Sequence, residues 1–262
     1  MSKLYTTRNT QLSYAWGEVF LELLKPGITK LSPAVVTVSA FDAKHLPIED
    51  ARVRDALDGF LAAKQTCRTV ASTIFPNSLW RPSAPNDAQD LYDRYETVWP
   101  RIKRCRLNAN GVYFRRLTAY GPKIEGCNVL PVNQLKHVIE TYVGGIHRHS
   151  ALQASILDPT RDHSHAPRRG FPCLQQVAFA AVGGELEVTG FYALQHHVTK
   201  AYGNYLGLCW LGRFMAQQMD LRLVRVTCVA SMLTLGEFGK GELSGLKALV
   251  EEQLPSDQEQ PS

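Results

Sequence analysis

Apolar residues recur at helical spacing in five stretches of the chain. The first stretch, residues 12–25, carries its large apolar side chains three and four positions apart and stops at Pro26-Gly27. The same spacing predicts the remaining helices over residues 48–71, 87–102, 135–143 and 204–220. The last of these is the most strongly apolar of the five.

Alternation of apolar and polar residues, together with β-branched runs, predicts five strands. They cover residues 34–41, 152–157, 174–182, 185–192 and 221–230. Gly183-Gly184 joins the third strand to the fourth, so we expect these two to form a hairpin. No internal repeat or low-complexity linker interrupts residues 1–262. We therefore expect one domain with an α+β fold, in which helices cover a mainly antiparallel or mixed sheet.

Composition narrows the class of protein. The chain has 262 residues, of which 45% are hydrophobic and 20% charged, and its formal net charge is +5. It contains no block of like charges, so we expect small anionic ligands rather than a nucleic acid polymer. No apolar run approaches the roughly eighteen residues of a membrane span, and the N-terminus lacks an apolar signal region. These features predict no membrane contact and a cytoplasmic location.

Six cysteines occur without a C-x-x-C pair, which argues against a zinc knuckle and a disulfide framework and favours a reducing compartment. Five of them are expected to be small buried apolar residues: Cys67, Cys105, Cys127, Cys209 and Cys228. Cys173 differs, because Arg168-Arg169-Gly170-Phe171-Pro172 places it at the start of a strand behind two cations. A thiolate there could be exposed, stabilised and used as a nucleophile.

Histidines form a second group. Six of the eight lie between residues 147 and 197, in the pairs His147/His149, His163/His165 and His196/His197. Pairs two residues apart on extended chain could bind a metal or supply acid and base groups, whereas an exposed loop needs no such role. No carboxylate or cysteine accompanies them at ligand spacing, so we expect no metal site.

Several short motifs follow one another in a recognisable order. They are Asn133-Gln134-Leu135 with Val138-Ile139, the strand end Ile156-Leu157-Asp158-Pro159, the Pro172-Cys173 strand, the hairpin, and the helix from Asn204 to Ala216-Gln217-Gln218-Met219. Their order and the interval from Cys173 to Asn204 resemble the thymidylate synthase superfamily over about residues 130–225.

The resemblance implies a thymidylate synthase-like fold, a sheet-to-sheet homodimer and a transferase chemistry. Cys173 would add to C6 of a pyrimidine nucleotide, and C5 would then take a methyl or hydroxymethyl group from methylene-tetrahydrofolate. Asn204 would read the O4 and N3 edge of the base, since an amide offers a donor and an acceptor together. The alternative for Asn204 is an N-cap of the following helix. Strands 152–157 and 177–182 would form the dimer interface.

The sequence departs from the family pattern at the positions that bind the substrate phosphate. Ala193 and Leu194 stand where the family has its phosphate-binding arginine and serine, and Ser150 and Ala151 stand where it has two arginines from the partner subunit. Other cations of the chain could replace the missing phosphate contacts. Alternatively, these other cations are ordinary solvated charges. The candidates are Arg148, Arg168, Arg169 and Arg115, the last with its neighbour Arg116.

Two further positions complete the candidate site. His196 occupies the place of the family's hairpin aspartate, where it could polarise a carbonyl, relay a proton or be a hydrogen-bonded structural residue. Glu96 is the candidate for the family's N-terminal glutamate. The C-terminal tail is polar at Asp257–Gln260 and does not match the family's apolar folate lid. Two functions remain open: a C5-modifying transferase, or a non-catalytic relative that binds a ligand or serves in an assembly.

Overall fold

The computed structural model describes residues 4–61, 65–83, 87–121, 130–163, 165 and 171–255, and the statements below concern these residues. The α-helices are α1 (Leu12–Leu24), α2 (Ala51–Phe60), α3 (Cys67–Ile74), α4 (Asp87–Arg104), α5 (Tyr113–Thr118), α6 (Gln134–Val143), α7 (Pro159–Asp162), α8 (Tyr202–Gln218) and α9 (Ser244–Gln253). Short helical turns are the 3₁₀ segments η1 (Arg106–Asn108) and η2 (His149–Ala151), and the π-helical turn η3 (His197–Ala201).

The strands form one large sheet and one small sheet. They are β1 (Tyr5–Thr6), β2 (Lys30–Leu31), β3 (Ala34–Val38), β4 (Gln153–Ser155), β5 (Leu174–Val182), β6 (Glu185–Tyr192), β7 (Gln195–His196), β8 (Arg222–Ala230) and β9 (Leu233–Thr234). The six-stranded sheet has the order β1-β3-β8-β6-β5-β4, and β2-β9-β7 form the three-stranded sheet. In the large sheet β1/β3 and β6/β8 are parallel, and the other pairs are antiparallel. The fold is therefore α+β with a mixed sheet.

The predicted hairpin is confirmed. Its strands β5 and β6 pair from Leu174↔Tyr192 to Val182↔Glu185. Gly183 and Gly184 have positive φ values of 59° and 82°, which L side chains rarely adopt and which suit a two-residue hairpin turn. The hairpin places the first residue of β5, next to Cys173, beside the last residue of β6.

Two helix predictions were wrong in part: one predicted helix is divided in two, and another begins earlier than predicted. The single helix expected over residues 48–71 is two helices, because Asp58 accepts a hydrogen bond from the Cys67 backbone N–H (2.7 Å) and Thr66 caps α3. The helix expected to begin near Asn204 begins earlier, and the π-helical turn η3 precedes it. Asn204 is therefore an interior helical residue, and the alternative of an N-cap is excluded.

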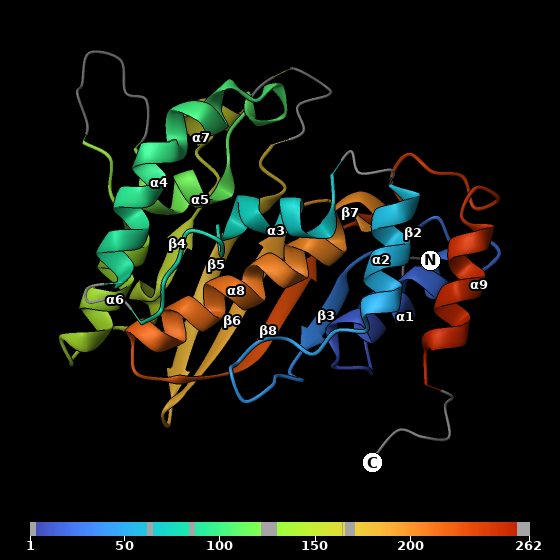
Figure 1. Cartoon of the computed structure of the whole chain (residues 1–262), viewed down its shortest axis with the longest axis horizontal. Helices are drawn as coiled ribbons and strands as arrows, with labels where there is room; N and C mark the ends of the chain where they lie inside the picture. The colour runs from blue at the N-terminus through green and yellow to red at the C-terminus, as the bar shows by residue number, and fades with distance from the viewer. Residues whose placement is uncertain are drawn as a thin grey trace.

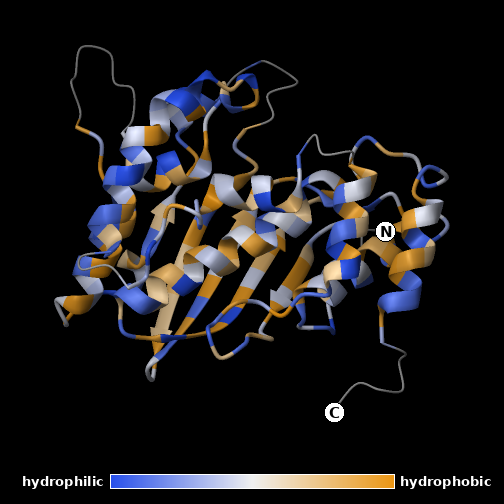
Figure 2. Cartoon of the chain, in the orientation of Figure 1, coloured by the Kyte–Doolittle hydropathy of each residue, from blue (hydrophilic) through white to orange (hydrophobic). Residues whose placement is uncertain are grey.

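Helix α8 lies between the large sheet and α3. In Figure 1 α8 and α3 cross in front of the strands, and Figure 2 shows hydrophobic residues along those strands and hydrophilic residues on α4 and α7. A Cβ at Gly203 would lie 2.5 Å from Val70 Cβ, and a Cβ at Gly207 would lie 2.8 Å from the Ala71 carbonyl oxygen. Glycine at these positions lets the two helix backbones approach closely.

Glutamine side chains from two of the quoted motifs tie elements together. Gln134 of α6 donates to the Ser155 carbonyl (2.8 Å) and accepts from the Ser155 N–H (2.9 Å) in β4. Gln217 and Gln218 of α8 donate to the buried carboxylate of Asp87 at the start of α4 (3.0 and 2.8 Å). These bonds fix α4 and α6 relative to α8 and the sheet.

The opposite face of the large sheet carries exposed or half-buried side chains. Phe191 is 40% and Val182 71% exposed on this face. The same face carries the cross-strand pairs Phe191↔Val229 and Ala178↔Thr189. This face mixes apolar residues with threonine, glutamine and charged side chains, and Glu187 forms an ion pair with Arg225 across it (3.4 Å). None of the helices in the described ranges has the length and apolar character needed to cross a membrane.

The close approach of α8 to α3 gives a stability prediction. Gly203→Ala should lower the free energy of unfolding by about 1–3 kcal/mol, because the added methyl must displace Val70 or the α3 backbone. The control is Gly59→Ala in α2, where nothing lies within 4 Å of the new Cβ. That change should raise the free energy of unfolding by up to about 1 kcal/mol, since alanine favours a helix. Urea denaturation of both variants measures this. Equal effects would contradict the packing described.

Candidate functional site

Cys173 lies where β5 begins, on the end of the sheet reached by the start of α8. It is half-buried, and the cis peptide bond Phe171–Pro172 precedes it. Its carbonyl accepts from the Ala193 backbone N–H (3.1 Å) just after β6. The first residues of β5 and the last of β6 thus hold the cysteine backbone from both sides.

Burial and one lysine act in opposite directions on the Cys173 thiol. Desolvation raises the pKa of Cys173, and the Lys200 ammonium partly offsets this by favouring the thiolate. In the described surroundings burial therefore favours the protonated thiol, while the two arginines that the sequence offers as stabilising cations, Arg168 and Arg169, lie outside the described residues. The Lys200 pKa is in turn lowered by desolvation and raised by Cys173, so the two groups interact.

Lys200 belongs to the π-helical turn η3. Its Nζ donates to Oε1 of Gln65, which lies just before α3. η3 is held from the other side by His197, whose ring stacks on Trp16 at 5.0 Å and whose Nε2 donates to the Trp16 carbonyl (2.9 Å). π-Helical turns often occur at functional sites. Here the turn carries a half-buried cation to the cysteine.

Tyrosines surround the sulfur. Burial raises the pKa of the Tyr113 hydroxyl, the Cys173 sulfur adds to the shift, and the backbone N–H groups of Leu174 and Cys173 oppose it by bonding to the oxygen. Tyr192 is fully buried, its pKa is raised by desolvation, and its hydroxyl has no hydrogen-bond partner among the described residues. Leaving such a group unpaired costs about 1–3 kcal/mol, so it is a candidate for bonding a ligand.

Asn204 is buried, with 3% of its surface exposed, inside α8. One turn later Leu208 packs on Gly190 of β6, where a Cβ would lie 2.6 Å from the leucine. The same Gly190 position is 3.4 Å from Leu174, the residue after Cys173. Because residues i and i+4 share a helix face, Asn204 lies on the face of α8 that covers the Cys173 end of the sheet.

The two adjacent histidines differ in their surroundings. His196 is half-buried in β7, and its Nδ1 lies 3.4 Å from Oγ1 of Thr234. Burial lowers the pKa of His197 to about 3, so its imidazole is neutral. His197, the first residue of η3, is thus a packing residue, while His196 lies in the small sheet beside Gly236.

Glu96 and Arg115 lie together and form a pair of their own. Glu96 is on α4, its side chain is 55% exposed, and it forms an ion pair with Arg115 of α5. The Arg115 guanidinium also covers the Trp99 ring at 5.0 Å. The candidate general base and a candidate substrate arginine therefore bind each other at the rim of a cleft.

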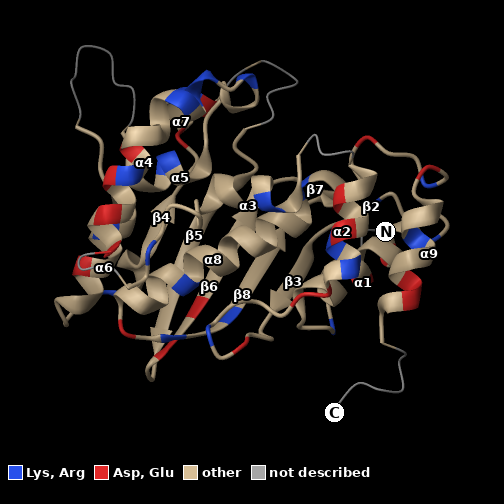
Figure 3. Cartoon of the chain, in the orientation of Figure 1, with Lys and Arg blue, Asp and Glu red and all other residues tan. Residues whose placement is uncertain are grey.

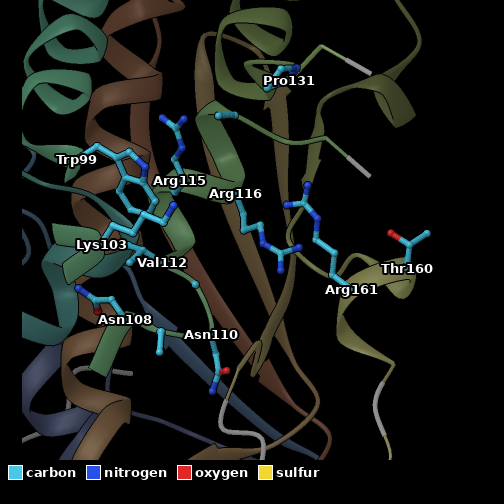
Figure 4. A pocket seen from close by; sticks show the side chains of 13 residues that line it. Trp99, Lys103, Asn108, Asn110, Val112, Arg115, Arg116, Pro131, Thr160 and Arg161 are labelled. Carbon is cyan, nitrogen blue, oxygen red and sulfur yellow. The ribbon is translucent and has the colours of Figure 1, made fainter. Parts of the chain in front are cut away.

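This basic cleft has a volume of about 690 Å³ and lies between α4, α5 and α7. It is lined by Trp99, Lys103, Asn108, Ala109, Asn110, Gly111, Val112, Arg115, Arg116, Ala119, Pro131, Thr160 and Arg161. Figure 3 shows Lys and Arg on these helices, and in Figure 4 the Arg116 and Arg161 side chains extend toward the same space.

Buried carboxylates organise one wall of the basic cleft. Arg116 is buried and donates to Asp162 (2.9 Å) and to the Ile156 carbonyl (3.3 Å). Asp158 caps α7 by accepting from the Thr160 N–H (3.0 Å), and it lies 3.2 Å from Nε of Arg161. This network fixes Thr160 and Arg161 at the edge of the cleft.

The remaining candidates lie elsewhere. Arg148 is exposed at the start of η2, beyond α6. Arg168, Arg169 and Cys127 lie outside the described residues, as does the tail Asp257–Gln260. Cys67, Cys209 and Cys228 are buried as predicted, but Cys105 is exposed, because it follows the last turn of α4 on the surface. His147 and His149 are 5.8 Å apart, between ring centroids.

Sequence reasoning missed Tyr113 and Lys200. A signal for Lys200 was present: histidine aside, it is the one charged residue between Glu187 and Arg213. Nothing in the run Val112-Tyr113-Phe114 distinguishes Tyr113, because only the fold brings α5 to the start of β5.

Comparisons with known proteins add no name to this site. No family model matches the chain, and no curated protein matches it. The interpretation of the site therefore rests on its geometry and on the motif resemblance.

The interaction of Lys200 with Cys173 gives a prediction for thiol reactivity. Lys200→Met removes the charge that favours the thiolate, so the pKa of Cys173 should rise further and its alkylation by iodoacetamide at pH 8 should slow. Mass spectrometry of the Cys173 peptide over pH 6–10 measures this. Lys247→Met in α9, an exposed lysine, is the control and should leave the profile unchanged. A Lys200→Met profile that matches the unaltered protein would contradict the assignment.

Proposed function

We propose that this protein is a thymidylate synthase-like transferase that activates C5 of a pyrimidine nucleotide through Cys173. The observation that carries the proposal is the group around Cys173: a half-buried thiol, an interacting Lys200, the Tyr113 hydroxyl and a buried amide, Asn204, on the covering helix. A nucleophile needs a nearby group to take its proton, and a pyrimidine edge needs a paired donor and acceptor.

The residues suggest the following steps. In the fraction of molecules in which Lys200 is a neutral amine, its Nζ takes the proton from Cys173 Sγ, and the thiolate forms a bond to C6 of the ring. The C5=C6 electron pair moves toward O4, where the Asn204 amide N–H stabilises the developing negative charge. C5 then bonds to a one-carbon electrophile and loses its proton, and the electron pair left at C5 re-forms the double bond as the sulfur departs.

Methylene-tetrahydrofolate is the one-carbon donor that the resemblance implies, but the described C-terminal residues do not form a folate lid. Helix α9 packs on α1 and α2, and Leu254 lies against Gly17, where a Cβ would be 2.7 Å from Leu254. In Figure 1 α9 lies at the opposite end of the molecule from α4 and α7. We therefore derive no step through a folate, and the experiment below includes assays with and without it.

Tritium release from C5-labelled dUMP, dCMP, UMP and CMP, with and without methylene-tetrahydrofolate, tests the proposal. We expect release from at least one of them. Cys173→Ser should abolish release, since serine is a far weaker nucleophile at neutral pH, and Cys105→Ser should leave it unchanged. Release that survives in Cys173→Ser would overturn the mechanism.

The second candidate function is a ligand-binding or assembly protein without catalysis. Ala193 and Leu194, at the family's phosphate-binding positions, and the raised pKa of Cys173 favour it. If no pyrimidine releases tritium, while the protein still binds one of them, this second function replaces the first.

We also propose that the exposed face of the large sheet forms a homodimer interface, as in the family that the chain resembles. Phe191 and Val182 are large apolar side chains that are 40% and 71% exposed on that face, and a second copy would cover them.

Sedimentation at micromolar concentration tests the dimer. The protein should sediment as a dimer, and Phe191→Glu should shift it toward the monomer because a carboxylate would be buried in the interface. Leu107→Glu is the control: Leu107 is 68% exposed, in η1 beside α4, and its replacement should not change the mass. A monomer for the unaltered protein would contradict the proposal.

A further inference from the structure

The basic cleft is not used by the chemistry proposed at Cys173. Its volume of about 690 Å³ is within the range of small-molecule sites, roughly 300–1,000 Å³. Lys103, Arg115, Arg116 and Arg161 supply four cations, and Asn108, Asn110 and Thr160 add neutral donors. Within the described part of the chain no Asp or Glu lines the cleft. Such a lining favours a ligand with more than one negative charge.

The carboxylates that pair with these cations leave the cleft open to an anion. Asp158 and Asp162 hold Arg116 from the protein interior, since each of their side chains is 1% exposed, and Asp158 also lies 3.2 Å from Nε of Arg161. Glu96 pairs with Arg115 at the exposed rim, where water screens the interaction. Lys103 is exposed, and no ion pair is recorded for it among the described residues.

One short segment connects the cleft to Cys173. Gly111, Val112, Arg115 and Arg116 line the cleft, and Tyr113 between them faces the cysteine. Phe171, two residues before Cys173, lies on Gly111, where a Cβ would be 2.6 Å from its ring. Its ring is 5.1 Å from that of Tyr113 and 5.4 Å from Cζ of Arg116. The rings of Phe171 and Tyr113 therefore connect Arg116, at the cleft, to Cys173.

We propose that the basic cleft binds the phosphate groups of the substrate, and that the substrate is a pyrimidine nucleoside di- or triphosphate. This inference rests on the function proposed above. The cations come from three elements, α4, α5 and α7, around a cleft of about 690 Å³, which is much more space than a single phosphate fills. A chain of two or three phosphates can reach them together, and arginine forks match phosphate oxygens. The cleft would thus supply the phosphate contacts that Ala193 and Leu194 cannot make.

Calorimetric titration with inorganic tripolyphosphate, dUTP, dUMP and a single-stranded oligonucleotide tests the inference. Tripolyphosphate and dUTP should bind more tightly than dUMP. Lys103→Gln and Arg115→Gln should each weaken tripolyphosphate binding by roughly tenfold or more, the effect of losing one charge-assisted contact. Arg101→Gln is the matched control: Arg101 is exposed on the same helix as Lys103 but outside the cleft lining, and its loss should have little effect. Circular dichroism checks that each variant is folded.

The outcomes separate the cleft from the chemistry. Unchanged binding in both cleft variants, or an equal loss in Arg101→Gln, would overturn the inference. So would tight binding of the oligonucleotide without binding of dUTP, which would point to a nucleic acid backbone. Cys173→Ser should keep tripolyphosphate binding. Suppose that Cys173→Ser binds tripolyphosphate and that the unaltered protein releases no C5 tritium from dUTP or from the monophosphates. The proposed function then fails and the phosphate site stands. If dUMP releases tritium but tripolyphosphate does not bind, the proposed function stands and the phosphate site is overturned.

Discussion

Close contact of α8 with α3 on one side and the sheet on the other is the constraint on which the candidate site depends. Gly203 and Gly207 allow the approach to α3, and Gly190 in β6 receives Leu208. A larger side chain at any of these positions would push α8 outward. The start of α8 carries Asn204, and η3 before it carries Lys200. The position of Lys200 near Cys173, and of Asn204 on the helix face over that end of the sheet, is therefore set by backbone contacts and not by the polar groups themselves.

Electrostatics at the site follows from that packing. The same burial that raises the pKa of Cys173 lowers that of Lys200, so both groups are shifted toward their neutral forms and transfer of the Cys173 proton to Lys200 costs more free energy than in water. The attraction between the thiolate and the ammonium offsets part of this cost. The site lies at the junction of the sheet end and the start of α8, where Tyr113 and Tyr192 also interact with Cys173. The basic cleft differs in exposure from one cation to the next: Lys103 is exposed, whereas Arg116 is buried against Asp158 and Asp162.

Much of the fold could be predicted from the sequence. The hairpin followed from two alternating runs and Gly183-Gly184, and α1, α6 and β8 followed from periodicity within one or two residues. The errors occurred where local pattern competes with tertiary contacts. Asp58, nine residues away, bonds to the Cys67 N–H and helps to separate α2 from α3. Trp16, far away in sequence, holds His197 in the π-helical turn that precedes α8.

For the site, the sequence by itself determined Cys173 and Asn204 as candidates, because a motif order and a fixed interval single them out. It also determined the mild positive charge and the absence of the family's phosphate residues. Only the tertiary structure decided which groups meet. Lys200 and Tyr113 come to Cys173 from η3 and α5, and Glu96 meets Arg115 at the cleft instead. Periodicity reports which side of an element is buried, but contacts between distant elements depend on how their surfaces pack.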